Sequence, residues 1–200
     1  MNNDKLKNYI AKTAYNIGFG AKKNFASFDI VNNLNEYISI LSMIIGVLAL
    51  VFEIFNAKII SATLLIFGII GLYINKFDKG VEEYEKYGVL YLKLYNQLHL
   101  LYNEVDASDD ILRKEILEEV KHIEEEFYNN NISKQVYFSD LLAHFKFYYQ
   151  FQTEWIVKEL NLTFWKDKIP NSLKVIIILF LIIVLIVIFF SQLFMKNICN

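Results

Sequence analysis

YISILSMIIGVLALVFEIF, from Tyr37 to Phe55, and IISATLLIFGIIGLYI, from Ile59 to Ile74, are two apolar stretches separated by only three residues. A membrane-spanning helix needs about 20 apolar residues, with roughly 17 to 25 the usual range. The first stretch is long enough, and the second is slightly short. Because the connection is so short, we expect an antiparallel transmembrane hairpin whose two outer ends lie on the same side of the membrane.

A third apolar block, VIIILFLIIVLIVIFFSQLFM, runs from Val175 to Met195 with Lys174 and Lys196 at its two ends. Its first sixteen residues are all Val, Ile, Leu or Phe. Residues of this kind each contribute about −0.3 to −0.6 kcal/mol, so insertion is favoured by about 5 to 10 kcal/mol. Since no polar residue precedes Ser191, we expect a lipid-facing C-terminal anchor.

The composition fits a membrane protein with a polar middle section. Of the 200 residues, 55% are hydrophobic and only one is proline. The net charge of −2 provides no concentrated basic surface, so direct binding of nucleic acid is not expected. The single cysteine, Cys199, excludes a disulfide within the chain and a cysteine-based zinc site.

Lysines near the ends of the apolar stretches predict the orientation. One set flanks the outer ends of the hairpin and the start of the third block: Lys5, Lys7, Lys12, Lys22, Lys23, Lys76, Lys79, Lys166, Lys168 and Lys174. The opposite side has only Lys58 and Lys196. The positive-inside rule therefore places the N-terminus and the middle section in the cytoplasm, with the hairpin tip and the C-terminus outside.

The middle section has helical spacing throughout and no alternating strand pattern. A heptad-like seam indicates a helix packed along a partner helix; its residues are Tyr84, Tyr87, Tyr91, Leu94, Leu98 and Leu101. The polar segment 106–110 ends this helix, and Ser108 or Asp109 is expected to cap a second helix that ends at 129–131. A further helix is predicted from Phe138 to Trp155.

The predicted fold is therefore all-α. It consists of a cytoplasmic amphipathic N-terminal helix over residues 1–36, a transmembrane hairpin over 37–76, a cytoplasmic helical hairpin or bundle over 77–170, and a C-terminal transmembrane helix over 171–200.

The N-terminal stretch TAYNIGFGAKKNF, Thr13 to Phe25, has the glycine and lysine content of a phosphate-binding loop but not its pattern. Gly18 and Gly20 lack a third glycine at the required spacing, and no strand precedes them. Apolar residues at steps of three or four predict a helix instead, with Lys12, Lys22 and Lys23 on other faces. This basic helix is expected either to lie on the anionic membrane surface or to pack against the base of the hairpin.

Residues with catalytic or metal-binding potential are few. His122 follows Glu119 and precedes Glu126 at helical spacing, but a di-iron site takes a second copy of this motif, which the sequence lacks. His99 and His144 have no ligand-spaced partners, and no nucleophile is accompanied by a base. We therefore expect no enzyme activity, no metal site and no cofactor.

The hairpin carries the candidate pore or interface residues. Glu53 is an ionisable group near the outer end of the first span; it either belongs to a ring of carboxylates at a pore mouth or pairs with Lys58 at the interface. Small residues let helices approach closely within one hairpin or between subunits; these are Ser42, Gly46, Gly68 and Gly71.

The segments TAYNIGFGAKKNFASFDIVNNL and FGIIGLYINKFDKGVEEYEKYG, with the helical region after them, resemble the SLATT family, the two-transmembrane effector domains of bacterial conflict systems. The third apolar block goes beyond the two spans of that family. The resemblance implies an anti-phage membrane effector that oligomerises and permeabilises the inner membrane when a partner detects infection. The implied partner is a co-encoded nucleotide-signal synthase or a reverse transcriptase. The alternative function is a non-enzymatic, membrane-anchored scaffold for a cytoplasmic defence partner.

Overall fold

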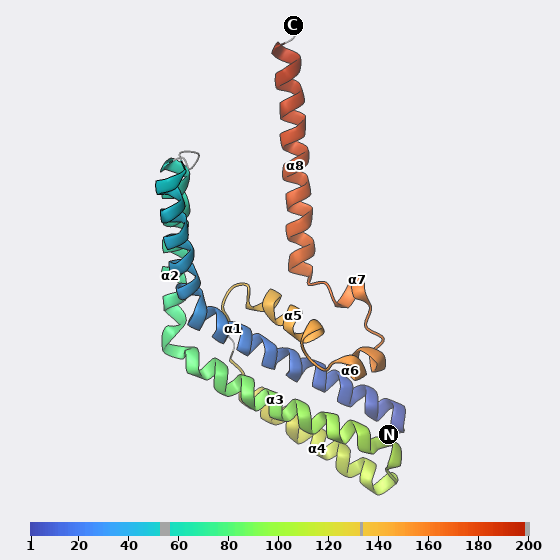
Figure 1. The fold of residues 1–200 in the computed structure, drawn as a ribbon. Helices are drawn as coiled ribbons and strands as arrows, with labels where there is room; N and C mark the ends of the chain where they lie inside the picture. Colours follow the sequence, from blue (N-terminus) through green and yellow to red (C-terminus); the bar gives the residue numbers. More distant parts are fainter. Residues whose placement is uncertain (53–56, 133, 199–200) are drawn as a thin grey trace. The chain divides into compact units, whose positions relative to one another are not determined.

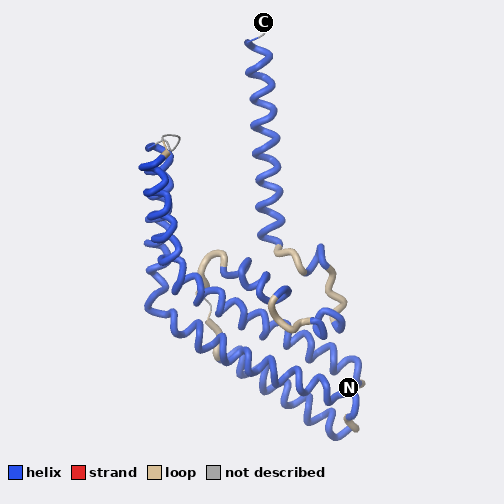
Figure 2. Tube along the Cα trace, viewed as in Figure 1, coloured by secondary structure: helices blue, strands red, loops and turns tan. Residues whose placement is uncertain are grey.

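The computed structural model describes residues 1–52, 57–132 and 134–198, and these ranges contain helices, turns and loops but no strand (Figure 2). The all-helical fold class is therefore confirmed for the described residues. The chain divides into two compact units, Met1–Asn161 and Leu162–Asn200. The first unit contains the N-terminal helix, the predicted hairpin and nearly all of the predicted middle section.

Helix α1, Asn3–Val51, joins the predicted N-terminal helix and the first span into one element of 49 residues. It begins where the Asn2 side chain accepts a hydrogen bond of 3.1 Å from the backbone N–H of Lys5. The helix changes direction between its two halves (Figure 1). Ser39 donates its hydroxyl proton to the Asn35 carbonyl four residues earlier, at 2.8 Å, an interaction of the kind that bends helices.

Helix α2, Ala57–Ile74, lies beside the second half of α1 (Figure 1). The 3₁₀ helix η1, Asn75–Gly80, leads from α2 directly into α3, Val81–Glu104. The second apolar stretch therefore continues into the long helix of the middle section, with a tighter 3₁₀ turn where the chain leaves α2. Such mid-helix 3₁₀ segments often mark hinges.

A second 3₁₀ turn, η2 at Val105–Ala107, precedes α4, Asp110–Asn129. The Asp109 side chain accepts hydrogen bonds from the backbone N–H groups of Ile111 and Leu112 at 3.1 and 2.8 Å. This is the predicted helix cap, and it satisfies N–H groups that have no partner inside the helix. Helix α4 ends within one residue of the predicted position.

The prediction of one continuous helix from Phe138 to Trp155 is wrong. The chain forms two short helices, α5 at Ser139–Tyr149 and α6 at Glu154–Glu159, with a break between them. In the break the Gln152 carbonyl accepts a hydrogen bond of 2.7 Å from the Tyr95 hydroxyl, and the Phe151 ring lies 4.5 Å from the Tyr95 ring. These tertiary contacts with α3 outweigh the local preference for a continuous helix.

The first half of α1 forms the centre of the core. Its fully buried apolar residues are Leu6, Ile10, Ala11, Ala14, Ile17, Ala21 and Ala26. They pack chiefly against α3 and α5, with α4 and α6 completing the bundle. The apolar face of the predicted N-terminal helix is therefore covered by protein, and a position of this helix on the membrane surface stays a prediction.

The second unit contains the short helix α7, Phe164–Asp167, and α8, Asn171–Ile198. Two stretches of the described chain are long and apolar enough to cross a membrane, one within α1 and one within Lys58–Ala107. Within α8, the shorter stretch Leu173–Ile186 is also apolar. Membrane spanning by α8 stays a prediction.

Candidate functional site

The hairpin formed by α1 and α2 presents most of its apolar side chains outward. Along α2 the partly covered positions recur at helical spacing and face α1: Ile60, Thr63, Phe67 and Gly71. Most of the other apolar residues of α2, such as Leu65 and Leu72, are exposed, whereas Ile74 at its end is buried. A face with this composition and exposure is suited to lipid.

The base of the hairpin is closed by a polar clamp. The Asn35 side-chain amide donates a hydrogen bond of 2.9 Å to the side-chain oxygen of Asn75. A Cβ atom on Gly71 would lie 3.3 Å from the side-chain oxygen of Asn35, tighter than an ordinary contact. Asn35 and Gly71 therefore bring α1 and α2 close together where the two helices leave the bundle.

The predicted small residues of the hairpin fall into different environments. Gly71 lies in the contact between α1 and α2, and Ser42 is half-buried. Gly46 and Gly68 have open space where a Cβ atom would stand, with no described atom within 4 Å. Gly46 and Gly68 are thus the small residues that remain available to another helix. Glu53 lies outside the described residues.

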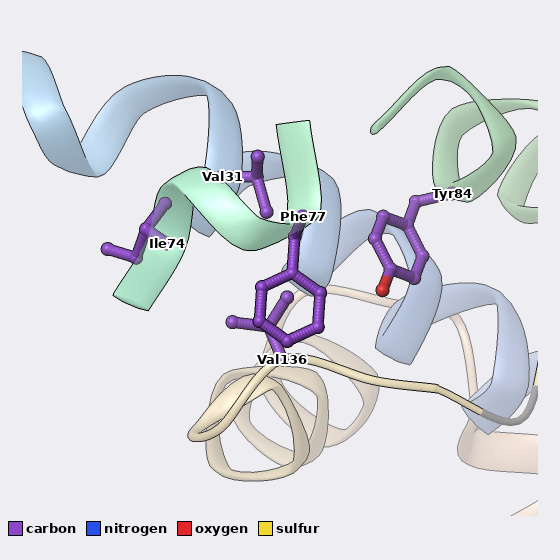
Figure 3. Packing of buried hydrophobic residues seen from close by; sticks show 5 residues of the cluster. All are labelled: Val31, Ile74, Phe77, Tyr84 and Val136. Atoms are coloured by element: carbon purple, nitrogen blue, oxygen red, sulfur yellow. The ribbon is translucent and has the colours of Figure 1, made fainter. Parts of the chain in front are cut away.

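A cluster of buried residues, here called the junction cluster, lies where the hairpin meets the bundle (Figure 3). It draws on α1, α2, η1, α3 and the segment before α5, and its members are Val31, Ile74, Phe77, Tyr84 and Val136. The cluster therefore connects the ends of the spans to α3 and to the segment before α5.

The predicted seam on α3 is packed inside the chain. Tyr84, Tyr91, Leu94 and Leu98 are buried, while Tyr87 and Leu101 are half-buried. Helix α1 of the same chain is the main partner of α3, so the buried part of the seam is not a free surface for self-association.

Tyrosine hydroxyls on α3 hold the loops that connect the later helices. Tyr84, Tyr91 and Tyr95 each donate a hydrogen bond of 2.7 Å, to the carbonyl oxygens of Lys134, Asn130 and Gln152 respectively. Burial raises the pKa of Tyr91 and of Tyr95 to about 12. The hydroxyls are therefore kept protonated as donors, and the loops are pinned to α3.

Two of the three lysines predicted at the membrane surface interact within the bundle. Lys22 lies over the Phe151 ring at 3.9 Å, and burial, followed by the charge of Lys146, lowers its pKa. Lys23 pairs with Asp140 at 3.1 Å, and Lys12 is exposed. Lipid contact by these lysines stays a prediction, and for Lys22 and Lys23 it would compete with these interactions.

The histidines are in separate surroundings. The His99 ring stacks on Trp155 with centroids 4.8 Å apart, and His144 is buried beside Phe19 and Tyr148. His122 is exposed on α4. Within residues 1–52, 57–132 and 134–198, no three metal-ligating side chains come together.

Three features of the bundle and of its junction with the hairpin were not predicted from the sequence. The 3₁₀ hinge η1 and the break between α5 and α6 have no local signal such as proline. The contact of Gly88 with the Phe25 ring, 2.9 Å from a Cβ position, brings together residues 63 positions apart in the chain. The glycine at position 88, beside the seam between Tyr84 and Tyr91, is the one signal that pointed to a large partner side chain there.

Two helices that are long and apolar enough to cross a membrane emerge from the helical bundle, as expected of a protein of the two-transmembrane type. The family model described as SMODS and SLOG-associating 2TM effector domain 6 matches residues 1–177, so the chain belongs to this family and the resemblance is confirmed. Domains of this family are effectors associated with SMODS and SLOG partners in conflict systems. Membership and the two apolar helices together indicate a membrane location. No curated protein and no solved structure matches the chain.

Proposed function

We propose that this protein is the membrane effector of an anti-phage defence system, which oligomerises through its hairpin and permeabilises the bacterial inner membrane when a partner reports infection. The observation that carries the proposal is the unbroken helical connection from the bundle to the membrane. Helix α1 belongs to both parts, and α2 continues through η1 into α3. A change in the bundle is thereby transmitted to the hairpin.

The hairpin supplies the surface for self-association. Gly46 and Gly68 are open in the monomer, and glycine permits the close helix approach on which association in lipid depends. We place the N-terminus and the bundle in the cytoplasm, according to the lysine distribution, with the C-terminus outside. In this orientation the bundle meets a cytoplasmic signal, and the partner is a co-encoded nucleotide-signal synthase or a reverse transcriptase.

The proposal is tested by expressing the protein together with its neighbouring genes and following the entry of a membrane-impermeant dye after the trigger. We expect dye entry to begin with, or before, growth arrest. An intact membrane during a triggered arrest contradicts permeabilisation.

A matched pair of variants tests the role of the open glycine. Gly68→Leu adds bulk to the open surface of α2, so we expect lower oligomer yield on crosslinking in membranes and less dye entry. Ala62→Leu adds bulk at another exposed position of α2 and should leave both unchanged. Equal effects of the two variants would show that added bulk, and not the Gly68 surface, is responsible.

The second candidate function is a scaffold, which is favoured by the large share of the chain that forms the bundle. In that case the spans only anchor the bundle. Replacing the hairpin with an unrelated one and deleting Val175–Met195 would then preserve defence, whereas the effector proposal predicts complete loss.

A further inference from the structure

Helix α5 is apolar on two opposite faces. One face is buried in the bundle through Ala143 and Phe147. The opposite face, here called the interfacial stripe, consists of Phe138, Leu141, Leu142, Phe145 and Tyr149, which recur at helical spacing. Of these, Phe138 is 71% exposed and Phe145 is 52% exposed. A helix that is apolar on both faces requires a second apolar surrounding in addition to the bundle.

The charges of α5 lie away from the interfacial stripe. Asp140 pairs with Lys23 and Lys146 pairs with Asp29, so both charged side chains of the helix are turned toward α1. The stripe itself carries no charge. Desolvating it therefore removes no ionic group from water.

An apolar groove of about 820 Å³ lies between this stripe and the hairpin. Leu141, Leu142 and Phe145 line one side, and Ile69, Ile70 and Tyr73 line the other. Every residue that lines the groove is Ile, Leu, Val, Phe or Tyr. The volume lies within the range of about 300 to 1,000 Å³ that accommodates a small organic ligand.

The groove is continuous with the surface that faces lipid. Ile69 and Ile70 belong to the apolar span of α2, and both are exposed. Figure 1 shows α5 on the side of the bundle toward which the hairpin extends. A groove that opens along a membrane-spanning helix, beside a helix facing the same membrane, meets acyl chains before it meets any soluble ligand.

Aromatic residues form the rim of the groove. The Tyr73 and Tyr137 rings stack with centroids 5.3 Å apart, and the Tyr73 hydroxyl accepts a hydrogen bond of 3.2 Å from the backbone N–H of Tyr137. Tyrosine is enriched at the boundary between lipid and water. Phe138 has a left-handed backbone with φ of 68°, which is strained for a bulky residue, yet its ring is left exposed. Strain that maintains an exposed aromatic side chain is typical of a binding surface.

From these observations we propose that the interfacial stripe rests in the membrane interface and that the groove holds an acyl chain of a phospholipid. The lipid comes from the leaflet at the Ile74 end of the hairpin. The bundle would thus have a membrane contact of its own, separate from the spans. This inference depends on the membrane location of the chain and not on permeabilisation.

The test places a fluorescent probe in the groove. In the full chain with Cys199→Ser, the only native cysteine is removed, and Phe145→Cys is labelled with an environment-sensitive fluorophore. Glu125→Cys on the exposed face of α4 is the matched control. Both proteins are reconstituted in phosphatidylglycerol and phosphatidylcholine nanodiscs, with or without phosphatidylcholine bearing a doxyl quencher on its acyl chain.

We expect severalfold stronger quenching at position 145 than at position 125. Leu141→Cys, a second position on the stripe, should behave like Phe145→Cys, and circular dichroism confirms that each variant is folded. Equal quenching at the stripe and at Glu125→Cys overturns the proposal. Energy transfer between labelled chains would show that a second copy covers the stripe, and this result also overturns the proposal. Quenching that appears only after deletion of residues 171–200 would show that the C-terminal helix covers the stripe, and it overturns the proposal as well.

A variant pair separates this inference from the proposed function. Phe145→Lys places a charge on the interfacial stripe and should weaken quenching at Leu141→Cys, while Phe145→Leu keeps the stripe apolar and should preserve it. Unchanged quenching in Phe145→Lys contradicts the inference whether or not the protein admits dye.

Discussion

The ring of Tyr95 lies so close to Gly18 that a Cβ atom on this glycine would come within 2.8 Å of ring atom Cδ2. The Phe147 ring approaches the same position to 3.1 Å. Gly18 thus provides the hollow on α1 in which aromatic side chains from α3 and α5 meet. The glycine that resembles part of a phosphate loop in the sequence is a packing residue at the centre of the bundle.

Gly18→Ala should destabilise the bundle although alanine favours helix. The gain in helix propensity is about 1 kcal/mol, whereas overpacking a core costs about 1 to 3 kcal/mol. We expect the cost to exceed the gain because the Tyr95 ring is buried and its hydroxyl is hydrogen-bonded. Thermal unfolding in detergent micelles measures the difference. Gly80→Ala, with no described atom within 4 Å of the Cβ position, should be neutral or stabilising; a comparable loss there would contradict the packing argument.

Tyr95→Phe should cost about 1 to 3 kcal/mol of unfolding free energy, because it leaves buried polar groups without partners. The Gln152 carbonyl loses its donor, and the Trp155 indole N–H loses the acceptor that lies 3.0 Å away. Faster proteolysis between α5 and α6 is the specific readout. Tyr149→Phe, at an exposed position, is the control and should leave both stability and cleavage unchanged.

Alkaline pH should unfold the bundle. Burial, aided by Glu124 for Tyr9 and by Glu159 for Tyr102, raises four tyrosine pKa values from 10.0 to about 12, those of Tyr9, Tyr91, Tyr95 and Tyr102. The unfolded chain loses these protons near pH 10 and the folded chain does not. Their stabilisation is therefore complete below pH 10 and is lost as pH rises toward about 12. Circular dichroism followed together with tyrosinate absorbance should show both changes in this window, and ionisation of all thirteen tyrosines near pH 10 in a fully folded bundle would contradict the prediction.

Asp29→Asn should weaken the docking of α5 on α1. Asp29 pairs with Lys146, and the charge of Lys146 also acts on Lys22. The pair is partly exposed, so the expected loss lies between the roughly 1 kcal/mol of a surface pair and the roughly 3 kcal/mol of breaking a buried pair. Adding Lys146→Met should recover part of this loss in a double-mutant cycle. No recovery would show that the two charges are not coupled.

The elements with a local signal were predictable from the sequence. Asp109 caps α4 as expected, because an acceptor side chain before an amphipathic stretch satisfies free N–H groups whatever the tertiary structure. The apolar stripes of α1 and α3 were found for the same reason. Their spacing shows that each helix buries one face, but it does not name the partner.

Features that depend on packing between helices were not predictable from the sequence. The stripe through Ile10 and Ala14 is equally suited to contact with lipid and with protein. It is buried in protein because α3 and α5 pack against it. In the stretch predicted as a helix from Phe138 onward, Phe138 and Phe145 are exposed, while Ala143 and Phe147 face the core. In a helix that is apolar on both faces, periodicity alone does not show which face packs in the bundle and which face stays exposed.

Because the core of the bundle is the first half of α1, the order of synthesis matters. Helices α3, α4 and α5, which cover that half, all follow the hairpin in the chain. When Leu6 to Ala21 leave the ribosome, their partners have not yet been made. The first half of α1 therefore has no helical partner when the hairpin is made, and the bundle is completed only after α5 has been synthesised.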